Sequence, residues 1–354
     1  MTPISICVIA KNEEKNINSF FSSIQKHFEN YPHEIIFVNT GSTDNTRKLA
    51  SVYTDKIYDF TWIDDFSAAR NFSISCASYD WILVLNCDEY ILNLNLNDLQ
   101  EMISNTPEGI GVINCIDYYK INNLDHTYQL RLPRFFSRKH FHYEDMTNEQ
   151  LVSLHDGPAN ITLLPLMIYH NRYNDTEEHI IQKTHYSISL LLKMAEQKPD
   201  HYLYFQLGQA YSYLEDYENA CYYYEKGFEY DIDPKQQYIQ LMMIGYGYAL
   251  LNQQYYEHAL SLKNIYHEFD TSADFVCLMG FIYLENNMLV EAMQQFTRAT
   301  SINKTFATGN NSFIPTYYMA YINELCGDID NAIFLYEKCG NYQPALDKLS
   351  LLLQ

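Results

Sequence analysis

The sequence predicts two domains of different class, an α/β domain in the first half of the chain and an all-helical repeat domain in the second. Over the first 90 residues, short apolar runs alternate with helix-period stripes, which is typical of parallel strands joined by helices. From Tyr202 onward, helices alternate with short polar turns. A small residue recurs at a fixed spacing in these helices, which indicates an internal repeat.

The first domain is predicted to contain four strands, and the first three are each followed by a helix. The expected strands are Ile4–Ala10, Glu34–Val38, Lys56–Phe60 and Trp81–Leu85. The expected helices are the apolar stripe from Ile17 to Phe28, a segment capped by Ser42 or Thr43 that runs through Val52, and Ala68–Cys76. This alternation predicts a parallel sheet with right-handed crossovers.

Beyond Glu89 the pattern loosens. Further strands are expected at Gly111–Ile116, Gln129–Phe135 and Leu163–Tyr169. The stretch from His140 to Gly157 is polar and is interpreted as a loop. A second polar segment, Asn171 to His179, leads into the helical half of the chain.

The fourth strand stops on a pair of carboxylates. Its apolar residues are followed at once by Asn86-Cys87-Asp88-Glu89. Open α/β sheets bind ligands at the carboxyl ends of their strands, and carboxylate oxygens suit a divalent cation that bridges a diphosphate. The sequence therefore predicts that this edge binds a nucleotide-linked substrate, although strand-end carboxylates can also serve as simple turn caps.

The second domain repeats one spacing four times. Two small residues lie 12 positions apart in each unit, namely Gly208 and Ala220, Gly247 and Ala259, Gly280 and Ala292, and Ala320 and Ala332. Small residues at this spacing let antiparallel helices approach closely, while aromatic side chains fill the layers between them. The units start 39, 33 and 40 residues apart, so their turns carry insertions. The second unit is the weakest, with Leu250 and Lys263 where aromatics are expected.

This pattern resembles the tetratricopeptide repeat, whose period is about 34 residues. A generic helical bundle with small residues at chance positions is the alternative. If the units are true repeats, the segment Ala345–Leu353 forms a terminal helix that covers the last apolar face.

Composition excludes several classes of partner. The chain has 354 residues with 47% hydrophobic and 15% aromatic content, which indicates folded cores. Its formal net charge is −21 without any basic run, so nucleic acid and anionic membranes are not expected to bind, whereas a basic peptide is acceptable. Neither a signal peptide nor a membrane-length apolar stretch is found. The eight cysteines lack zinc or redox spacing, so we expect free thiols in a cytoplasmic protein.

Four motifs of the first domain resemble those of family 2 glycosyltransferases of GT-A type. They are Cys7 to Glu14, Asn39 to Asp44, Asp65 to Asn71, and Asn86 to Glu89, in that order. A GT-A domain followed by tetratricopeptide repeats is similar in layout to bacterial protein glycosyltransferases, among them bacteriocin S-glycosyltransferases and flagellin-modifying enzymes. We therefore expect a GT-A catalytic domain at 1–175, a helical linker at 176–200 and repeats at 201–354.

The resemblance implies a UDP-sugar site at the strand ends. The residues it assigns to the nucleotide-sugar are Ala10, Lys11, Asn12, Glu13, Asn39, Asp44, Arg70, Asn71, Asn86 and Cys87. Arg70 is expected near the diphosphate because a planar guanidinium suits phosphate oxygens, with a surface ion pair to Asp64 or Asp65 as the alternative. Asn39 stands where the family usually has Asp. An amide donates as well as accepts hydrogen bonds, so the identity of the nucleotide base stays open, with uridine favoured.

The resemblance also implies a Mn²⁺ or Mg²⁺ site. Asp88 closes the segment that occupies the family's Asp-x-Asp position, and Glu89 adds a nearby anion that could compensate for Asn86. His170 follows an apolar strand at a position where the family often has a histidine that joins the metal or the diphosphate. We therefore expect Asp88 and His170 to hold the ion, and Arg172 to add a phosphate contact.

Inverting transfer needs a carboxylate that takes the acceptor's proton. Glu149 matches the family's Glu and is the first candidate, and Asp145 is the second; Asn148 replaces the usual His. The expected activity is metal-dependent transfer from a UDP-sugar to a Ser, Thr or Cys side chain of a peptide or protein. A weak base would favour the thiol, whose ordinary pKa is about 8.5.

Two other functions remain open. The acceptor could be a surface glycan. Alternatively, the asparagines at Asn39, Asn86 and Asn148 could mark a degenerate catalytic domain that only scaffolds a partner bound by the repeats. The tyrosine-rich repeats could bind a peptide or form a homodimer.

Overall fold

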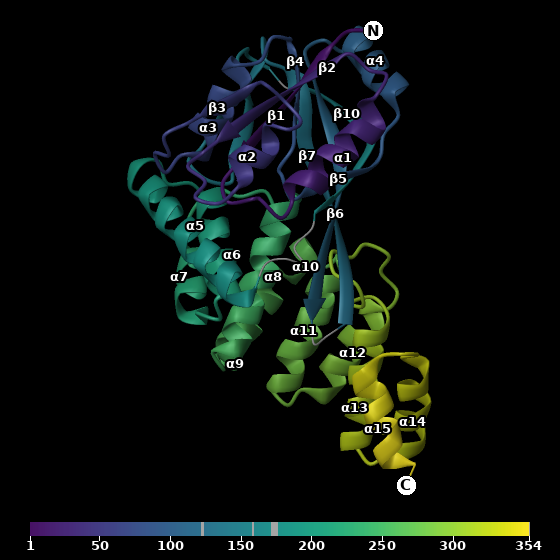
Figure 1. Ribbon diagram of the computed structural model, residues 1–354. Helices are drawn as coiled ribbons and strands as arrows, with labels where there is room; N and C mark the ends of the chain where they lie inside the picture. Colours follow the sequence, from purple (N-terminus) through teal and green to yellow (C-terminus); the bar gives the residue numbers. More distant parts are fainter. Residues whose placement is uncertain (122–123, 158, 171–175, 354) are drawn as a thin grey trace. The chain divides into compact units, whose positions relative to one another are not determined.

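The computed structural model describes residues 1–121, 124–157, 159–170 and 176–353. The chain divides into two compact units, Met1–Lys183 and Thr184–Gln354. The first unit is built around a mixed sheet with helices, and the second is entirely helical over its described residues (Figure 1). The predicted fold class is therefore confirmed.

An eight-stranded sheet forms the centre of the first unit, in the order β3-β2-β1-β4-β7-β6-β10-β5. The strands are β1 (Ile4–Ala10), β2 (His33–Asn39), β3 (Ile57–Asp59), β4 (Trp81–Val84), β5 (Glu89–Asn93), β6 (Gly109–Ile121), β7 (Leu124–Ser137) and β10 (Asn160–His170). The first four strands are parallel, as predicted. In contrast, β7 and β5 run antiparallel to their neighbours, which makes the rest of the sheet mixed.

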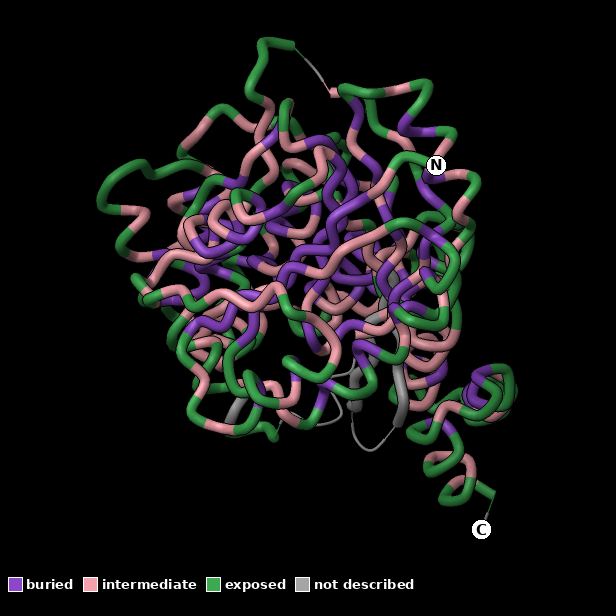
Figure 2. The backbone as a smooth tube through the Cα atoms, turned by 45° about the horizontal axis from the view of Figure 1, so that its top comes forward, coloured by how far each residue is buried: buried purple, intermediate pink, exposed green. Residues whose placement is uncertain are grey.

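Helices cover both faces of this sheet. They are α1 (Ile17–Phe28), α2 (Thr46–Ala50), α3 (Phe66–Ser75) and α4 (Leu96–Asn105). Residues of a strand alternate between faces, so Ile6 and Val8 of β1 pack in one core with Phe20 of α1, while Cys7 packs in the other with Ile74 of α3. Figure 2 colours the backbone by burial, with buried stretches in purple and exposed stretches, mostly on the outer turns, in green.

A short hairpin replaces the loop predicted between His140 and Gly157. Its strands are β8 (Phe141–Glu144) and β9 (Gln150–Ser153). Asn71 of α3 fixes the hairpin, because its Nδ2 donates to the Tyr143 carbonyl at 2.8 Å and its Oδ1 accepts from the Tyr143 N–H at 2.9 Å. The rings of Phe141 and Tyr143 pack edge-on against Phe136. The prediction failed because a distant side chain and two buried rings order an otherwise polar segment.

The second unit contains four helix pairs. The long helix α5 (Glu177–Gln197) spans the boundary between the units. The pairs follow as α6 (His201–Tyr213) with α7 (Tyr217–Phe228), α8 (Gln237–Asn252) with α9 (Tyr256–Leu260), α11 (Ala273–Glu285) with α12 (Leu289–Ala299), and α13 (Phe313–Leu325) with α14 (Ile329–Lys338). In the weak second unit, the second helix is broken into α9, a 3-10 turn and α10 (Tyr266–Phe269). The chain ends in α15 (Gln343–Leu352). No helix among the described residues has both the length and the apolar character that a membrane crossing needs.

The turns within the pairs repeat as regularly as the small residues. Glu215, Gln254 and Asn287 have φ of 58°, 60° and 59°, and Gly327 has φ of 81°. Each lies seven positions after the first small residue of its unit. A left-handed residue ends a helix by letting the chain reverse, so all four units use the same helix stop.

A buried carboxylate explains the long insertion before the fourth unit. Asp274 is 2% exposed and accepts hydrogen bonds from the N–H groups of Phe306 and Ala307 at 2.7 and 2.9 Å. It also accepts from Ser272 Oγ and Asn310 Nδ2, at 3.0 and 2.9 Å. Because all its lone pairs are directed at donors, this carboxylate attaches the inserted loop to the start of α11.

Replacing Gly208 with Ala should destabilise the second unit by about 1–3 kcal/mol, because an added Cβ overpacks a filled site. That Cβ would lie 2.4 Å from a ring carbon of the buried Tyr224. Gly227→Ala is the matched control, since the nearest atom to its Cβ would be the sulfur of the flexible Met242 side chain at 2.9 Å, and the other neighbours lie at 3.4 Å or more. Helix propensity alone then gives a gain of up to about 1 kcal/mol. Hydrogen exchange in α6 and α7 measures both effects, and equal effects would contradict the close approach.

Candidate functional site

The loops after β1 and β2 are joined by hydrogen bonds at the carboxyl edge of the sheet. The backbone N–H of Asn12 donates to Ser42 Oγ at 3.0 Å, and the side-chain Oδ1 of Asn12 accepts from the Thr43 N–H at 2.8 Å. Asp44 accepts from the N–H groups of Glu14 and Thr46 at 3.2 and 2.9 Å. Burial would raise the pKa of Asp44, but hydrogen bonds from Thr46 outweigh it and lower the pKa.

This arrangement brings together five of the predicted residues, Ala10, Lys11, Asn12, Glu13 and Asp44. Their roles differ. Ala10 is buried, and its backbone carbonyl accepts a hydrogen bond from the Thr40 N–H at 2.9 Å, whereas Lys11 is exposed. The side chains of Asn12 and Asp44 hold the two loops against each other, so they shape the edge of the site.

Asn39 lies at the end of β2 and is only 8% exposed. Its Oδ1 accepts from the Ser42 N–H at 3.0 Å, and its Nδ2 donates to Asp59 at 2.9 Å. Both ends of the amide are thus engaged within the protein.

Arg70 connects the predicted base to the fourth strand. Its Nε donates to Glu149, and its Nη2 donates to Asn86 Oδ1 at 3.0 Å. It does not form the alternative surface pair, since Asp65 caps α3 by accepting from the Ala68 N–H at 2.8 Å. The Nη1 group of Arg70 is buried without a hydrogen-bond partner in the described structure. An unsatisfied guanidinium N–H is costly to bury and could donate a hydrogen bond to a phosphate oxygen.

Glu89 belongs to this network and not to the metal site. It is 2% exposed and accepts from Arg134 Nη2 at 3.1 Å. It also accepts from the N–H and Nδ2 of Asn86, at 2.8 and 3.1 Å. The expectation that Glu89 compensates for Asn86 as a nearby anion is therefore wrong, because its charge is paired with Arg134. Its role is to orient Asn86 toward Arg70.

Two assigned residues point elsewhere. Cys87 is 2% exposed and packs in the apolar core, where burial raises the pKa of its thiol. The structure therefore gives no support to a contact between its side chain and the nucleotide. The side-chain amide of Asn71 is hydrogen-bonded at both its oxygen and its nitrogen to the backbone of Tyr143, so Asn71 orders the hairpin whose turn carries Glu149.

Asp88 and His170 come into contact although 82 residues separate them. β10 pairs with β5 so that His170 lies opposite Glu89, and His170 Nε2 is 3.0 Å from Asp88 Oδ2. The two side chains are 20% and 22% exposed. Burial raises the pKa of Asp88, but the hydrogen bond and charge of His170 outweigh it, and the net pKa is lowered. Arg172, expected to add a phosphate contact, lies outside the described residues.

The Asp88–His170 pair fits a divalent cation. Two neighbouring ligands of an octahedral ion, each about 2.1 Å from it, lie about 3 Å apart, as these two atoms do. No cluster of three or more acidic, histidine or cysteine ligands occurs in the described part of the chain. A divalent cation such as Mg²⁺ is commonly held by one or two carboxylates together with substrate phosphates and water, and Asp88 supplies one such carboxylate here.

The two candidate bases share the β8–β9 turn but differ in surroundings. Glu149 is 14% exposed on its side chain and is paired with Arg70. Burial raises its pKa, yet the charge and hydrogen bond of Arg70 outweigh this and lower the pKa of Glu149. Asp145 is exposed, with φ of 77°. Glu149 therefore joins the buried network through Arg70, whereas Asp145 lies at the surface.

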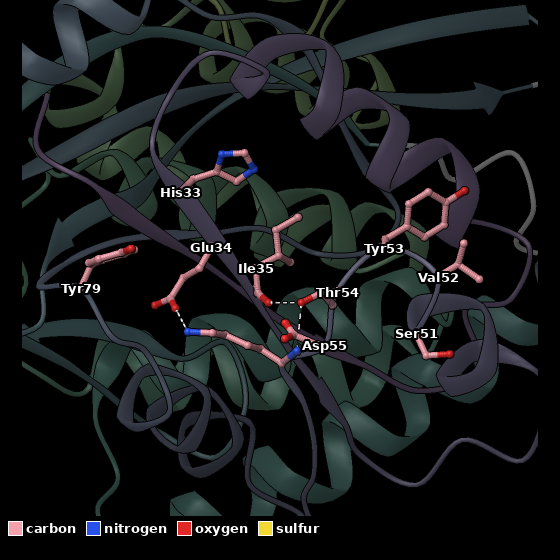
Figure 3. A pocket seen from close by; sticks show the side chains of 10 residues that line it. His33, Glu34, Ile35, Ser51, Val52, Tyr53, Thr54, Asp55 and Tyr79 are labelled. Atoms are coloured by element: carbon pink, nitrogen blue, oxygen red, sulfur yellow. Dashed lines mark hydrogen bonds and ion pairs between the residues drawn. The ribbon is translucent and has the colours of Figure 1, made fainter.

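A hollow of about 560 Å³ lies at the opposite edge of the sheet, where β2 and β3 begin (Figure 3). It is lined by His33, Glu34, Ile35, Ser51, Val52, Tyr53, Thr54, Asp55, Lys56 and Tyr79. None of the predicted site residues lines it. Its electrostatics instead concern stability, because Glu34 accepts from Lys56 Nζ, from Ser5 Oγ at 2.5 Å and from the Ser78 N–H at 2.5 Å.

Glu34 should make the first unit less stable in acid. Burial raises its pKa, but the donors around it outweigh burial and lower the pKa to about 2 from its ordinary 4.5. Since the folded pKa is depressed, the stabilisation is complete above about pH 4.5 and is lost as the pH falls toward 2, and its size is about 3 kcal/mol.

Urea unfolding of wild type and Glu34→Gln between pH 7 and pH 3 measures this contribution. Fluorescence reports the first unit, because both tryptophans, Trp62 and Trp81, lie there. The difference between the two proteins should shrink as the pH falls. A difference that stays constant with pH would contradict the low pKa.

Comparison with known proteins agrees with the predicted fold class. Residues 5–162 match the family described as Glycosyl transferase family 2, and residues 201–231 match the tetratricopeptide repeat. The chain thus carries a family 2 glycosyltransferase domain followed by tetratricopeptide repeats, and the predicted resemblance is confirmed.

The chain is also similar to individual proteins. The chain is 28% identical over 223 residues to a TPR repeat-containing protein of Synechococcus elongatus, covering 59% of this chain and 52% of that protein. It therefore spans about half the length of that relative. It is 26% identical over 322 residues to the SPbeta prophage-derived glycosyltransferase SunS of Bacillus subtilis, covering 86% of this chain and 74% of that protein. The match to glycosyltransferase SunS of Bacillus phage SPbeta has the same values.

Proposed function

We propose that the protein is an inverting, metal-dependent glycosyltransferase that moves a sugar from a UDP-sugar to a Cys, Ser or Thr side chain of a peptide or protein. The observation that carries this proposal is the contact between Asp88 and His170 at the ligand-binding edge of a family 2 glycosyltransferase domain. The similarity to glycosyltransferase SunS supports transfer chemistry.

Each residue of the network has a role in this reaction. Asp88 and His170 would hold a Mn²⁺ or Mg²⁺ ion, which offsets the charge that develops on the diphosphate as UDP leaves. Arg70 would donate from its unsatisfied Nη1 group to a phosphate oxygen. Asn86, held by Glu89, keeps the guanidinium of Arg70 in place.

Glu149 takes the proton from the acceptor as the nucleophile attacks the anomeric carbon. Arg70 lowers the pKa of Glu149, which makes this carboxylate a weaker base. A thiol with an ordinary pKa of about 8.5 needs little help to ionise, whereas a hydroxyl needs much more. The weak base therefore favours cysteine over serine or threonine as the acceptor.

The repeat domain would bind the acceptor. Tetratricopeptide arrays present grooves for peptides, and the net charge of −21 suits a basic one. A homodimer formed through the repeats is the alternative use of this domain.

Mass spectrometry tests the proposal. The protein is incubated with Mn²⁺, a panel of UDP-hexoses and UDP-N-acetylhexosamines, and basic peptides that differ only in carrying Cys, Ser or Ala. We expect one sugar to add to the Cys peptide, less to add to the Ser peptide and none to the Ala peptide. Tight peptide binding without transfer or UDP release from any donor would contradict the proposal and favour a scaffold.

A further inference from the structure

The amide of Asn39 is fixed in one orientation by its two neighbours. The Ser42 N–H can only donate, so it faces the amide oxygen, and the Asp59 carboxylate only accepts, so it faces the amide nitrogen. A flipped amide would lose both hydrogen bonds. Because Asn39 is also 8% exposed, its carbonyl is poorly placed to accept a hydrogen bond from a ligand.

Asp59 supplies a carboxylate beside this amide. It ends β3 and pairs in register with Asn39, so both side chains lie at the carboxyl edge of the sheet. Its Oδ1 accepts from Asn39 Nδ2 at 2.9 Å and from Arg47 Nε at 3.1 Å, and Oδ2 accepts only a longer bond of 3.2 Å from the same Nε. The Asp59 and Arg47 side chains are 58% and 54% exposed. The edge thus presents an acceptor and a donor side by side to solvent.

Both groups stay charged at neutral pH. Hydrogen bonds from Asn39 and then from Arg47 lower the pKa of Asp59. A guanidinium is protonated at any physiological pH. The acceptor and the donor are therefore present together in the free protein, without any titration.

We propose that Asp59 and Arg47 read the base of the donor nucleotide, and that Asn39 positions Asp59. This inference rests on the proposed function, which supplies the nucleotide. Asp59 Oδ2 has room for one further donor, which matches the N3–H of uracil. The terminal N–H groups of Arg47 match the carbonyl oxygen beside that N–H.

The geometry disfavours guanine. Its N1–H and N2–H pair would need both carboxylate oxygens, and Oδ1 already accepts two hydrogen bonds. An ionised acceptor makes a charge-assisted hydrogen bond with a base N–H. Loss of this hydrogen bond should raise the dissociation constant roughly tenfold to hundredfold.

Calorimetry with Mn²⁺ tests this assignment on the full chain. Asp59→Asn should weaken UDP binding about tenfold to a hundredfold, and it should leave Mn²⁺-dependent binding of inorganic pyrophosphate unchanged. The ratio of CDP to UDP affinity should rise, because the new amide can donate to N3 of cytosine, which lacks a hydrogen. Asp55→Asn is the matched control, since Asp55 is exposed just before the other end of β3, and it should bind UDP as wild type does.

Asn39→Asp separates the inference from the simpler view that Asn39 itself reads the base. A carboxylate at this position would lie against Asp59 and repel it, so we expect weaker UDP binding. Tighter binding, or an unchanged UDP affinity of Asp59→Asn, would overturn the inference while the proposed function stood. A wild-type protein that binds neither nucleotides nor pyrophosphate would overturn the proposed function itself, and this inference with it.

Discussion

Asp88→Asn should lower glycosyl transfer at least about a hundredfold and remove its dependence on Mn²⁺, because a neutral amide replaces one of the two proposed protein ligands. The fold should persist, since the amide can still accept the hydrogen bond that joins this residue to His170 Nε2. Initial rates of transfer at increasing Mn²⁺ concentrations measure the effect.

Asp80→Asn provides the control for this experiment. Asp80 lies just before the start of β4, is 44% exposed and pairs with Lys139 at 2.7 Å, so it is an acid next to the same strand but at its opposite end. Its replacement should leave the Mn²⁺ titration as in wild type. If Asp88→Asn kept the wild-type titration, Asp88 could not be a metal ligand.

Glu149→Gln should lower transfer to a hydroxyl acceptor by about 10²–10⁴, the usual contribution of a general base. The loss should be smaller for a thiol peptide and should recover as the pH rises toward the thiol pKa of about 8.5. Because the pKa of Glu149 is lowered, the carboxylate stays ionised through neutral pH, and wild-type rates should show no loss of base near pH 6 or 7. Rates with Cys and Ser peptides between pH 6 and 9 measure both effects.

Asp145→Asn separates the two candidate bases. Asp145 lies in the same turn as Glu149 but is exposed, so its replacement should change the rate little. If Asp145→Asn lost most of its transfer rate while Glu149→Gln kept a normal rate, Asp145 would be the catalytic base in place of Glu149. In that case Glu149 would serve to hold Arg70.

The parallel half of the sheet and the edge proposed to bind the ligand could be predicted from local pattern. Trp81 to Val84 is a buried apolar run, and strand ends on one side of a parallel sheet lie together whatever their distance along the chain. The helical repeat was predictable for a similar reason, because Gly208 and Gly280 each lie against a ring, those of Tyr224 and Phe296, and a larger side chain would not fit there.

The contents of the site were less predictable, because they depend on contacts between distant residues. Glu89 was expected near the metal, but Arg134, 45 residues away, pairs with it in the interior. The predicted strand Gln129–Phe135 contains two arginines, and the local pattern does not say which of them pairs with Glu89. Likewise, the role of Asp59 depends on the register between β2 and β3, which places it beside Asn39.

A crystal of the protein grown with UDP and Mn²⁺ tests the central claim most directly. Anomalous scattering should place one Mn²⁺ ion in contact with both Asp88 and His170, with the diphosphate completing its coordination and Arg70 bonded to a phosphate oxygen. Manganese and UDP bound elsewhere, or an edge that stays closed by the Asp88–His170 and Arg70–Glu149 contacts at saturating ligand, would contradict it.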